Sequence, residues 1–206
     1  MAQVTKGIRS LLSVPWLYVA WGRLLGGDRA RKELVDRIMK VEPGDRVFDI
    51  GCGTASLFEK LPEGAKYTGF DVSLEYVEEA RQRLGDAATI IHAAVGDSPS
   101  VPEGQFDISV ANGVLHHLGD DEAECLFELA YRSLRRGGKL VTVDPVYVEG
   151  QSRVARWLIS RDRGQNVRRP EAYKLIANGC FGNVSTTIRH DRLRIPYTHL
   201  IMECTK

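Results

Sequence analysis

Short apolar runs alternate with amphipathic segments through the middle of the chain. Five runs have the length and composition of buried strands: 46–50, 66–71, 89–95, 105–112 and 138–145. Four segments are expected to be helical: 28–41, 54–61, 74–84 and 121–134. Strands that alternate with helices over short connections predict a parallel sheet with helices on both faces.

The last third of the chain departs from this alternation. Two further strand-like runs, 183–191 and 196–204, are separated by a short loop in a proline-containing stretch. That spacing leaves no room for a crossover helix, so the two strands are expected to pair as an antiparallel hairpin. The predicted fold class is α/β: a Rossmann-like, doubly wound, mostly parallel seven-stranded sheet that ends in an antiparallel hairpin.

The beginning of the chain carries a different pattern. An apolar run rich in aromatic residues, 11–21, follows Lys6 and Arg9. This charge order is similar to that of a secretory signal, but no small-residue cleavage pattern follows. The run is also too short to span a bilayer. We expect N-terminal helices that pack as a lid, with a membrane-docking helix as the alternative.

Composition excludes several function classes. The chain of 206 residues is 43% hydrophobic, which is enough for one core. Its formal net charge of +1 gives no field that would attract nucleic acid. The four cysteines form no C-x-x-C pair, which argues against a zinc or dithiol site and fits a reduced, cytoplasmic setting.

The sequence VFDIGCGTA (47–55) is the strongest chemical signal. It places Asp49, Gly51 and Gly53 between an expected strand and an expected helix. Glycines at such a turn allow a ligand to approach the backbone closely. Asp71 ends the second strand about twenty residues later, where a carboxylate accepts hydrogen bonds from ribose hydroxyls.

The same motif distinguishes two classes of cofactor. Dinucleotide-binding folds place three glycines around a pyrophosphate, and this chain lacks the third glycine. A carboxylate at Asp49 would repel a pyrophosphate, but it suits a ligand with an ammonium group. S-adenosylmethionine carries an amino group and a sulfonium and no phosphate. The residues therefore favour S-adenosylmethionine over a nicotinamide cofactor.

Over residues 30–206 the chain resembles the class I S-adenosylmethionine-dependent methyltransferases. The resemblance rests on an ordered series of motifs: DIGCGTA, YTGFD, AAVGDS, FDISVANGVLHHL, LRRGGKLVTVDP and the terminal hairpin. It implies direct methyl transfer to a small acceptor, with S-adenosylhomocysteine as product. It also implies a single domain over 1–206, with a lid at 1–41, a cofactor-binding half at 42–145 and an acceptor side at 146–206.

The resemblance assigns the methionine end of the cofactor to the first glycine turn. That end would be lined by Asp49, Gly51, Cys52 and Gly53. Asn112, at the end of the fourth strand, would offer its backbone carbonyl to the ammonium group of the cofactor. The structural alternative is that these glycines only form a turn.

The adenosine end is assigned to the next two strand ends. Asp71 would bind the ribose and Val72 would lie against the adenine. Asp97 and the backbone of Ser98 would reach the adenine amino group. The alternatives are a helix-capping role for Asp71 and a turn role for Asp97.

The segment GVLHHLGD (113–120) supplies the candidate base. An acceptor hydroxyl or ammonium must lose a proton, and histidine titrates in the required range. By analogy with relatives that methylate phosphoethanolamine, we expect His117 as the base and Tyr18 as its partner. The alternative is that the histidine pair only shapes the loop. No metal is expected, because adjacent residues such as His116 and His117 seldom point at one ion.

Further acceptor-side candidates follow the fifth strand. Ligands of open α/β sheets bind beyond the carboxyl ends of strands, so Asp144 and Tyr147 should face the acceptor. Asp144 is either a second base or anchor, or a turn cap. In the hairpin, His190 and His199 either line the pocket or have structural roles.

The stretch LISRDRGQNVRRPE (158–171) concentrates four arginines after the fifth strand. Guanidinium groups match phosphates and carboxylates, so Arg161 and Arg163 are expected to hold an anionic acceptor. The alternative is a solvated loop whose arginines pair with Asp162, Glu171 or Asp191. Two other functions stay open: a non-catalytic S-adenosylmethionine-binding sensor or partner subunit, and a methyltransferase of a membrane-bound lipid.

Overall fold

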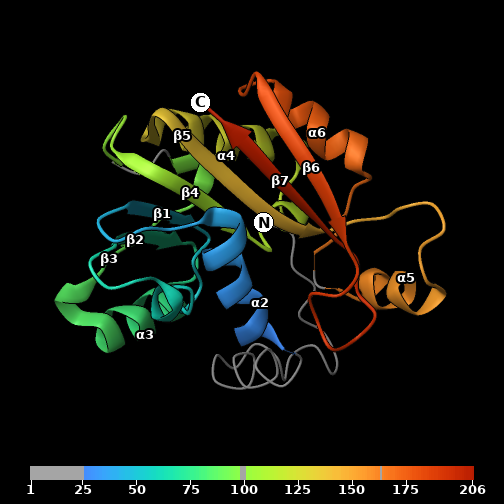
Figure 1. The fold of residues 1–206 in the computed structure, drawn as a ribbon, viewed down its shortest axis with the longest axis horizontal. Coiled ribbons are helices and arrows are strands. Elements are labelled where there is room, and N and C mark those ends of the chain that lie inside the picture. Colours follow the sequence, from blue (N-terminus) through green and yellow to red (C-terminus); the bar gives the residue numbers. More distant parts are fainter. Residues whose placement is uncertain (1–25, 98–100, 163) are drawn as a thin grey trace.

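A computed structural model describes residues 26–97, 101–162 and 164–206 as a sheet between helical layers (Figure 1). The sheet has seven strands in the order β3-β2-β1-β4-β5-β7-β6. The strands are β1 (Arg46–Ile50), β2 (Lys66–Asp71), β3 (Thr89–His92), β4 (Phe106–Asn112), β5 (Leu134–Pro145), β6 (Asn183–Arg189) and β7 (His199–Thr205). Neighbours among β1 to β5 pair parallel, while β7 lies antiparallel between β5 and β6. The predicted sheet and its terminal hairpin are confirmed, and the apolar run 11–21, expected to belong to a lid, lies outside the described residues.

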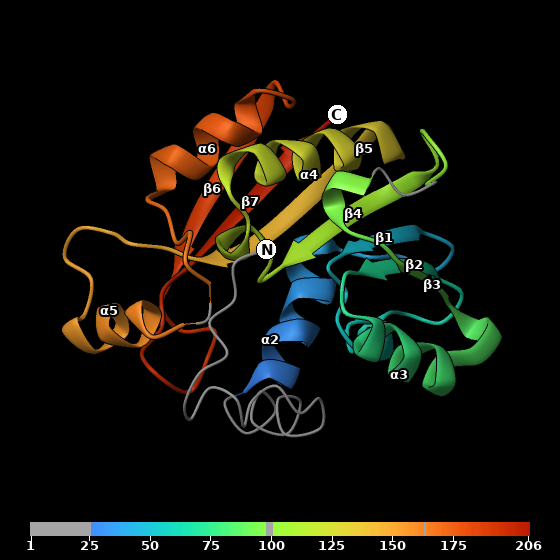
Figure 2. The same ribbon diagram turned by 180° about the vertical axis from the view of Figure 1, so that it is seen from behind.

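Helices cover both faces of this sheet (Figures 1 and 2). The α-helices are α2 (Gly27–Glu33), α3 (Leu74–Leu84), α4 (Asp120–Ser133), α5 (Arg153–Ser160) and α6 (Pro170–Asn178). A π-helical segment, Leu34–Met39, continues α2. Short 3-10 turns span Phe58–Lys60, Gly85–Ala87, Val95–Asp97 and Leu115–His117. Among the described residues, no helix is both long and apolar enough to cross a bilayer.

Each face of the sheet has its own apolar core, because side chains alternate along a strand. On one face Phe48 lies between Phe70 and Phe106, with ring centroids 5.6 and 5.0 Å away, and α4 and α6 cover this cluster. On the other face Val47 packs with residues of α3 and of the Leu34–Met39 segment. The two cores fix the sheet from both sides, and the carboxyl ends of the parallel strands β1 to β5 lie at the same edge.

Some element boundaries differ from the sequence-based expectation. The helix expected at 54–61 is a series of turns that ends in the short Phe58–Lys60 segment. Gly53 and Ala55 have φ angles of 56° and 54°, and this left-handed backbone is incompatible with a helix. Helices α5 and α6 were not predicted, although Ala155 and Ile159, the buried residues of α5, have the four-residue spacing of one helix face.

Phe127 of α4 gives a direct test of this packing. Its side chain is fully buried, and its ring makes an edge contact with Phe181, 6.4 Å away. Replacing Phe127 with Ala should lower the free energy of unfolding by about 3–5 kcal/mol in urea titrations, because it leaves a cavity between α4 and α6. Glu124→Ala, on the exposed side of the same helix, should change it by less than about 0.5 kcal/mol. Equal effects of the two changes would contradict the proposed core.

Candidate active site

A tight glycine turn follows β1. The backbone N–H groups of Gly51 and Cys52 both donate to the carbonyl of Phe70, at 2.9 Å each. Gly51 has a φ of 72°, and a Cβ there would lie 2.7 Å from a methyl of Val114. A Cβ at Gly53 would meet nothing within 4 Å. The turn is thus packed on one side and open above Gly53, as a backbone that receives a ligand requires.

Asp71 holds this turn to the end of β2. One carboxylate oxygen accepts the Gly53 N–H and the other accepts the Ser73 N–H, each at 2.8 Å. Each oxygen keeps acceptor capacity, since a carboxylate oxygen has two lone pairs. Ser73 also caps α3 by accepting the Tyr76 N–H at 3.4 Å. The neighbouring Val72 is 42% exposed, which leaves an apolar surface beside the carboxylate.

Asp49 lies beneath the glycine turn and is only 4% exposed. Tyr67 donates its hydroxyl to this carboxylate at 2.6 Å. Burial raises the pKa of Asp49 to about 7, the Tyr67 hydrogen bond opposes the shift, and the charge of Asp71 adds to it. Burial, followed by the charge of Asp49, also raises the pKa of the Cys52 thiol. A cationic ligand would therefore be favoured here, because it would compensate a poorly solvated carboxylate.

Other expected cofactor residues lie along the same edge of the sheet. Asn112 is exposed at the end of β4, next to β1 in the sheet. Asp97 follows β3 and accepts the Ala94 N–H at 3.0 Å, so its turn role is present in the structure. Ser98 lies outside the described residues. The structure therefore brings the expected set together at the ends of β1, β2 and β4, with Asp97 beyond β3.

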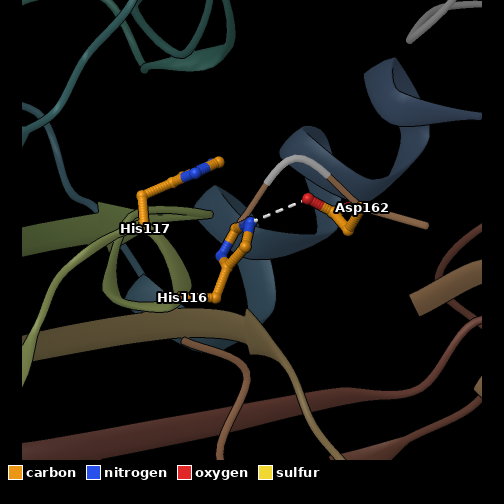
Figure 3. Close-up of side chains that lie close together, drawn as sticks. All are labelled: His116, His117 and Asp162. Carbon is orange, nitrogen blue, oxygen red and sulfur yellow. Dashed lines mark ion pairs between the residues drawn. The ribbon is translucent and has the colours of Figure 1, made fainter. Parts of the chain in front are cut away.

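A second group of polar residues centres on His116, which is 5% exposed (Figure 3). Its Nδ1 lies 2.8 Å from Asp144 Oδ1, and its Nε2 lies 3.3 Å from Asp162 Oδ1. Tyr197 donates its hydroxyl to the other oxygen of Asp162 at 2.6 Å. This series of contacts joins the end of β5 to the loop after α5 and to the loop before β7. Asp144, expected as a base or anchor, is thus a buried partner of His116.

The two carboxylates determine the protonation of His116. Burial alone would lower its pKa, but the hydrogen bonds and charges of Asp144 and Asp162 raise it to about 9. The same contact with His116 lowers the pKa of Asp162 against the effect of its own burial. Burial raises the pKa of the Asp144 carboxyl and the His116 contact opposes this. His116 is accordingly an imidazolium at neutral pH and is poorly suited to accept another proton.

His117 lies beside this group. Its ring centroid is 4.0 Å from that of His116, with an angle of 40° between the planes. One ligand atom from each of His116, His117 and Asp162 falls within 4.8 Å of the others. No carboxylate spacing around the histidine pair indicated a metal site in the sequence, and the fold brings Asp162 to the pair from a distant segment. Both nitrogens of His116 are already paired with carboxylates, so hydrogen bonding accounts for the cluster without an ion.

The arginine stretch divides into residues with different roles. Arg168 pairs with Asp120 at 2.7 Å and donates to the carbonyls of Leu115 and Leu118. It therefore fastens the residues just before α6 to the segment that carries the histidines. Gly164 packs directly against His116, because a Cβ at this position would lie 2.0 Å from a ring carbon of that histidine.

The remaining acceptor-side candidates are more exposed. Arg161 ends α5 and its guanidinium lies over the ring of Trp157. Tyr147 is half-buried, and His190 is exposed with its Nδ1 3.1 Å from Thr198 Oγ1. Tyr18 and Arg163 lie outside the described residues. The pairing of the arginines with Asp162 or Asp191 is wrong for the described residues: Asp162 pairs with His116, and Asp191 pairs with Arg189 from β6.

His116 and Arg168 are functional-site residues that the sequence interpretation missed. The available signal was the parallel pairing of β4 with β5, which brings the residues after β4 next to the end of β5. Asp144 was expected there, and His116, four residues after the end of β4, is within its reach. No comparable local signal identifies Asp162 or Arg168 as partners.

Comparisons with known proteins find methyltransferases. A family model described as a methyltransferase domain matches residues 48–142. Phosphoethanolamine N-methyltransferase 1 of Zea mays is 26% identical over 174 residues, 81% of this chain and 34% of that protein. An uncharacterized methyltransferase of Synechocystis is 27% identical over 135 residues, covering 63% of each. The chain spans about a third of the length of several curated relatives that it matches.

Solved structures show the same fold. Phosphoethanolamine N-methyltransferase 2 of Haemonchus contortus, bound to phosphomonomethylethanolamine and S-adenosylhomocysteine, matches with a TM-score of 0.71 and 21% identity over 88% of this chain and 45% of that chain. Geranyl diphosphate C-methyltransferase of Streptomyces coelicolor matches with a TM-score of 0.68 and 15% identity, over 87% of this chain and 81% of that chain. These similarities confirm a class I methyltransferase fold.

The His116 network predicts a pH dependence of stability. Because the folded protein raises the pKa of His116 to about 9, the stabilisation is complete below about pH 6.5, the ordinary pKa of histidine. It is lost as the pH rises toward 9, by about 3 kcal/mol at most. Asp162→Asn lowers the pKa of His116, so its free energy of unfolding, measured in urea, should fall less between pH 7 and 9.

Asp191→Asn is the matched control for this measurement. Asp191 is an exposed carboxylate on the hairpin and makes no contact with His116. Its variant should show the same pH dependence as the unmodified chain over this interval. If the free energy of unfolding of Asp162→Asn falls with pH as steeply as that of the unmodified chain, Asp162 does not raise the pKa of His116.

Proposed function

We propose that the chain is an S-adenosylmethionine-dependent methyltransferase of a small, anionic acceptor, since residues 48–142 match a family model described as a methyltransferase domain. The observation that carries the proposal is the glycine turn between Asp49 and Asp71. It combines an open backbone, a buried carboxylate with a raised pKa and a second carboxylate with acceptor capacity. The four free cysteines fit a reducing, cytoplasmic setting.

The described residues fit the chemical groups of S-adenosylmethionine. Asp49 would favour its ammonium group, and the backbone carbonyl of Asn112 would accept a hydrogen bond from it. Asp71 would accept the ribose hydroxyls, and the exposed Val72 would lie against the adenine. When bound, the cofactor would supply a methyl group on a positively charged sulfur. A nucleophile with a free lone pair would take the methyl group directly, and the sulfur would leave as S-adenosylhomocysteine.

The acceptor side has to orient that nucleophile and remove its proton. His117 is the better base of the two histidines, because both nitrogens of His116 already contact carboxylates. The imidazolium of His116 would instead hold the segment beside His117 in place, because Asp144 and Asp162 offset its charge. Arg161 and Arg163 remain the predicted anion contacts. Positioning should supply most of the rate acceleration.

The test compares two acceptors that differ only in a phosphate. The chain is incubated with S-adenosylmethionine and either phosphoethanolamine or ethanolamine, and S-adenosylhomocysteine is measured by mass spectrometry. We choose phosphoethanolamine because similar proteins are named for it. Product with phosphoethanolamine and little with ethanolamine supports the proposal. Binding of the cofactor without turnover, on these compounds or a metabolite extract, would support a non-catalytic sensor instead.

His117→Gln tests the role of the base. Loss of general-base catalysis should lower kcat by about 10²- to 10⁴-fold, and the acid limb of the kcat/KM profile should flatten. Affinity for S-adenosylhomocysteine, measured by calorimetry, should stay unchanged, because His117 is not among the expected cofactor contacts. Full turnover with an unchanged pH profile would mean that the histidine pair only shapes the loop.

A further inference from the structure

Helix α5 presents a face rich in arginine and tryptophan to the solvent. Its buried residues are Ala155 and Ile159, which lie on one side of the helix. The opposite side carries Arg153 and Trp157, which are neighbours because residues four apart share a helix face. Trp157 is 57% exposed and Val154 is 53% exposed. Both figures show α5 beyond the ends of β5 and β6, with this helix set apart from the layers of the sheet (Figures 1 and 2).

The positive charge on this face has no counterpart within the described part of the chain. Helix α5 contains no acidic residue. Arg153, Arg156 and Arg161 make no ion pair with a described carboxylate, in contrast to Arg168. Arg156 lies over the ring of Tyr147 at 5.2 Å and Arg161 over that of Trp157 at 5.6 Å. Arg156 and Arg161 are thus held beside aromatic rings, and all three guanidinium groups are available to an anion.

A shallow hollow connects these side chains. It has a volume of about 350 Å³ and is lined by Tyr147, Arg153, Arg156, Trp157 and Ser160. Two arginines in one wall match the geometry of a phosphate group. Since the hollow is open to solvent, it does not enclose a small molecule as a metabolite pocket does.

We propose that this face of α5 docks on an anionic lipid bilayer. Trp157 and Val154 would enter the interface, and the arginines would pair with lipid phosphates. A free phosphorylated metabolite would leave Trp157 and Val154 exposed, so it explains only part of the surface. A nucleic acid is disfavoured because the whole chain has a net charge of only +1. The proposal does not depend on the methyltransferase activity, but its surface adjoins the predicted acceptor side, to which Tyr147 and Arg161 also belong.

The test is co-sedimentation of the full chain with vesicles. Vesicles of phosphatidylcholine with 30% phosphatidylglycerol are compared with vesicles of phosphatidylcholine alone. The chain should bind the anionic vesicles with a salt-sensitive affinity and bind the neutral ones weakly. Arg153→Gln combined with Arg156→Gln should weaken binding about 25-fold, since each arginine near an anionic surface contributes about fivefold. Trp157→Ala should weaken it as well.

Arg132→Gln combined with Arg136→Gln is the matched control. Both arginines are exposed near the amino end of β5, and Tyr147 lies just past the other end of that strand. This variant loses the same charge and should bind like the unmodified chain. No binding to anionic vesicles, or equal loss in both double variants, would overturn the proposal. If the chain binds soluble phosphate or an acidic peptide but not the vesicles, the lipid proposal is overturned and the partner is a different one. Thermal unfolding and S-adenosylhomocysteine affinity report separately on the fold and on the proposed activity.

Discussion

The expected acceptor side of this protein depends on one buried imidazolium. His116 is held between Asp144 at the end of β5 and Asp162 in the loop after α5, and Tyr197 completes the contact from the loop before β7. Three segments that are distant in sequence therefore meet at one charged ring. A buried charge is costly unless it is paired, so Asp144 and Asp162 together fix the position of the ring. The loop can follow its observed path only because Gly164 leaves room for the ring.

The cofactor side rests on a different constraint, which is the common direction of β1, β2 and β4. Parallel strands end at one edge of the sheet, and each supplies a polar group near its end: Asp49 within β1, Asp71 at the end of β2 and Asn112 at the end of β4. The glycine turn then brings backbone N–H groups to the same edge. The histidine segment begins directly after β4. The two halves of the site are therefore joined by a few residues of chain, which places a base candidate beside the expected methyl donor.

Much of this arrangement could be predicted from the sequence. The five parallel strands and the antiparallel ending follow from apolar runs and their spacing, and Asp71 follows from its place at a strand end. The residues that were missed share one property, namely that their partners come from distant segments. Asp162 and Arg168 read as members of a solvated charge run, yet they contact His116 and Asp120. The prediction of a helix at 54–61 was wrong for a local reason, because Ala55 adopts a left-handed backbone conformation that the sequence does not indicate.

The central claim is that the turn between Asp49 and Asp71 binds S-adenosylmethionine with its methyl group directed toward His117. A crystal structure of the chain with S-adenosylhomocysteine tests it most directly. We expect both ribose hydroxyls within hydrogen-bonding distance of the Asp71 carboxylate, the amino group near Asp49 and the Asn112 carbonyl, and the sulfur on the side of His117. A ligand bound elsewhere, or one whose sulfur faces away from the histidine segment, would contradict the account.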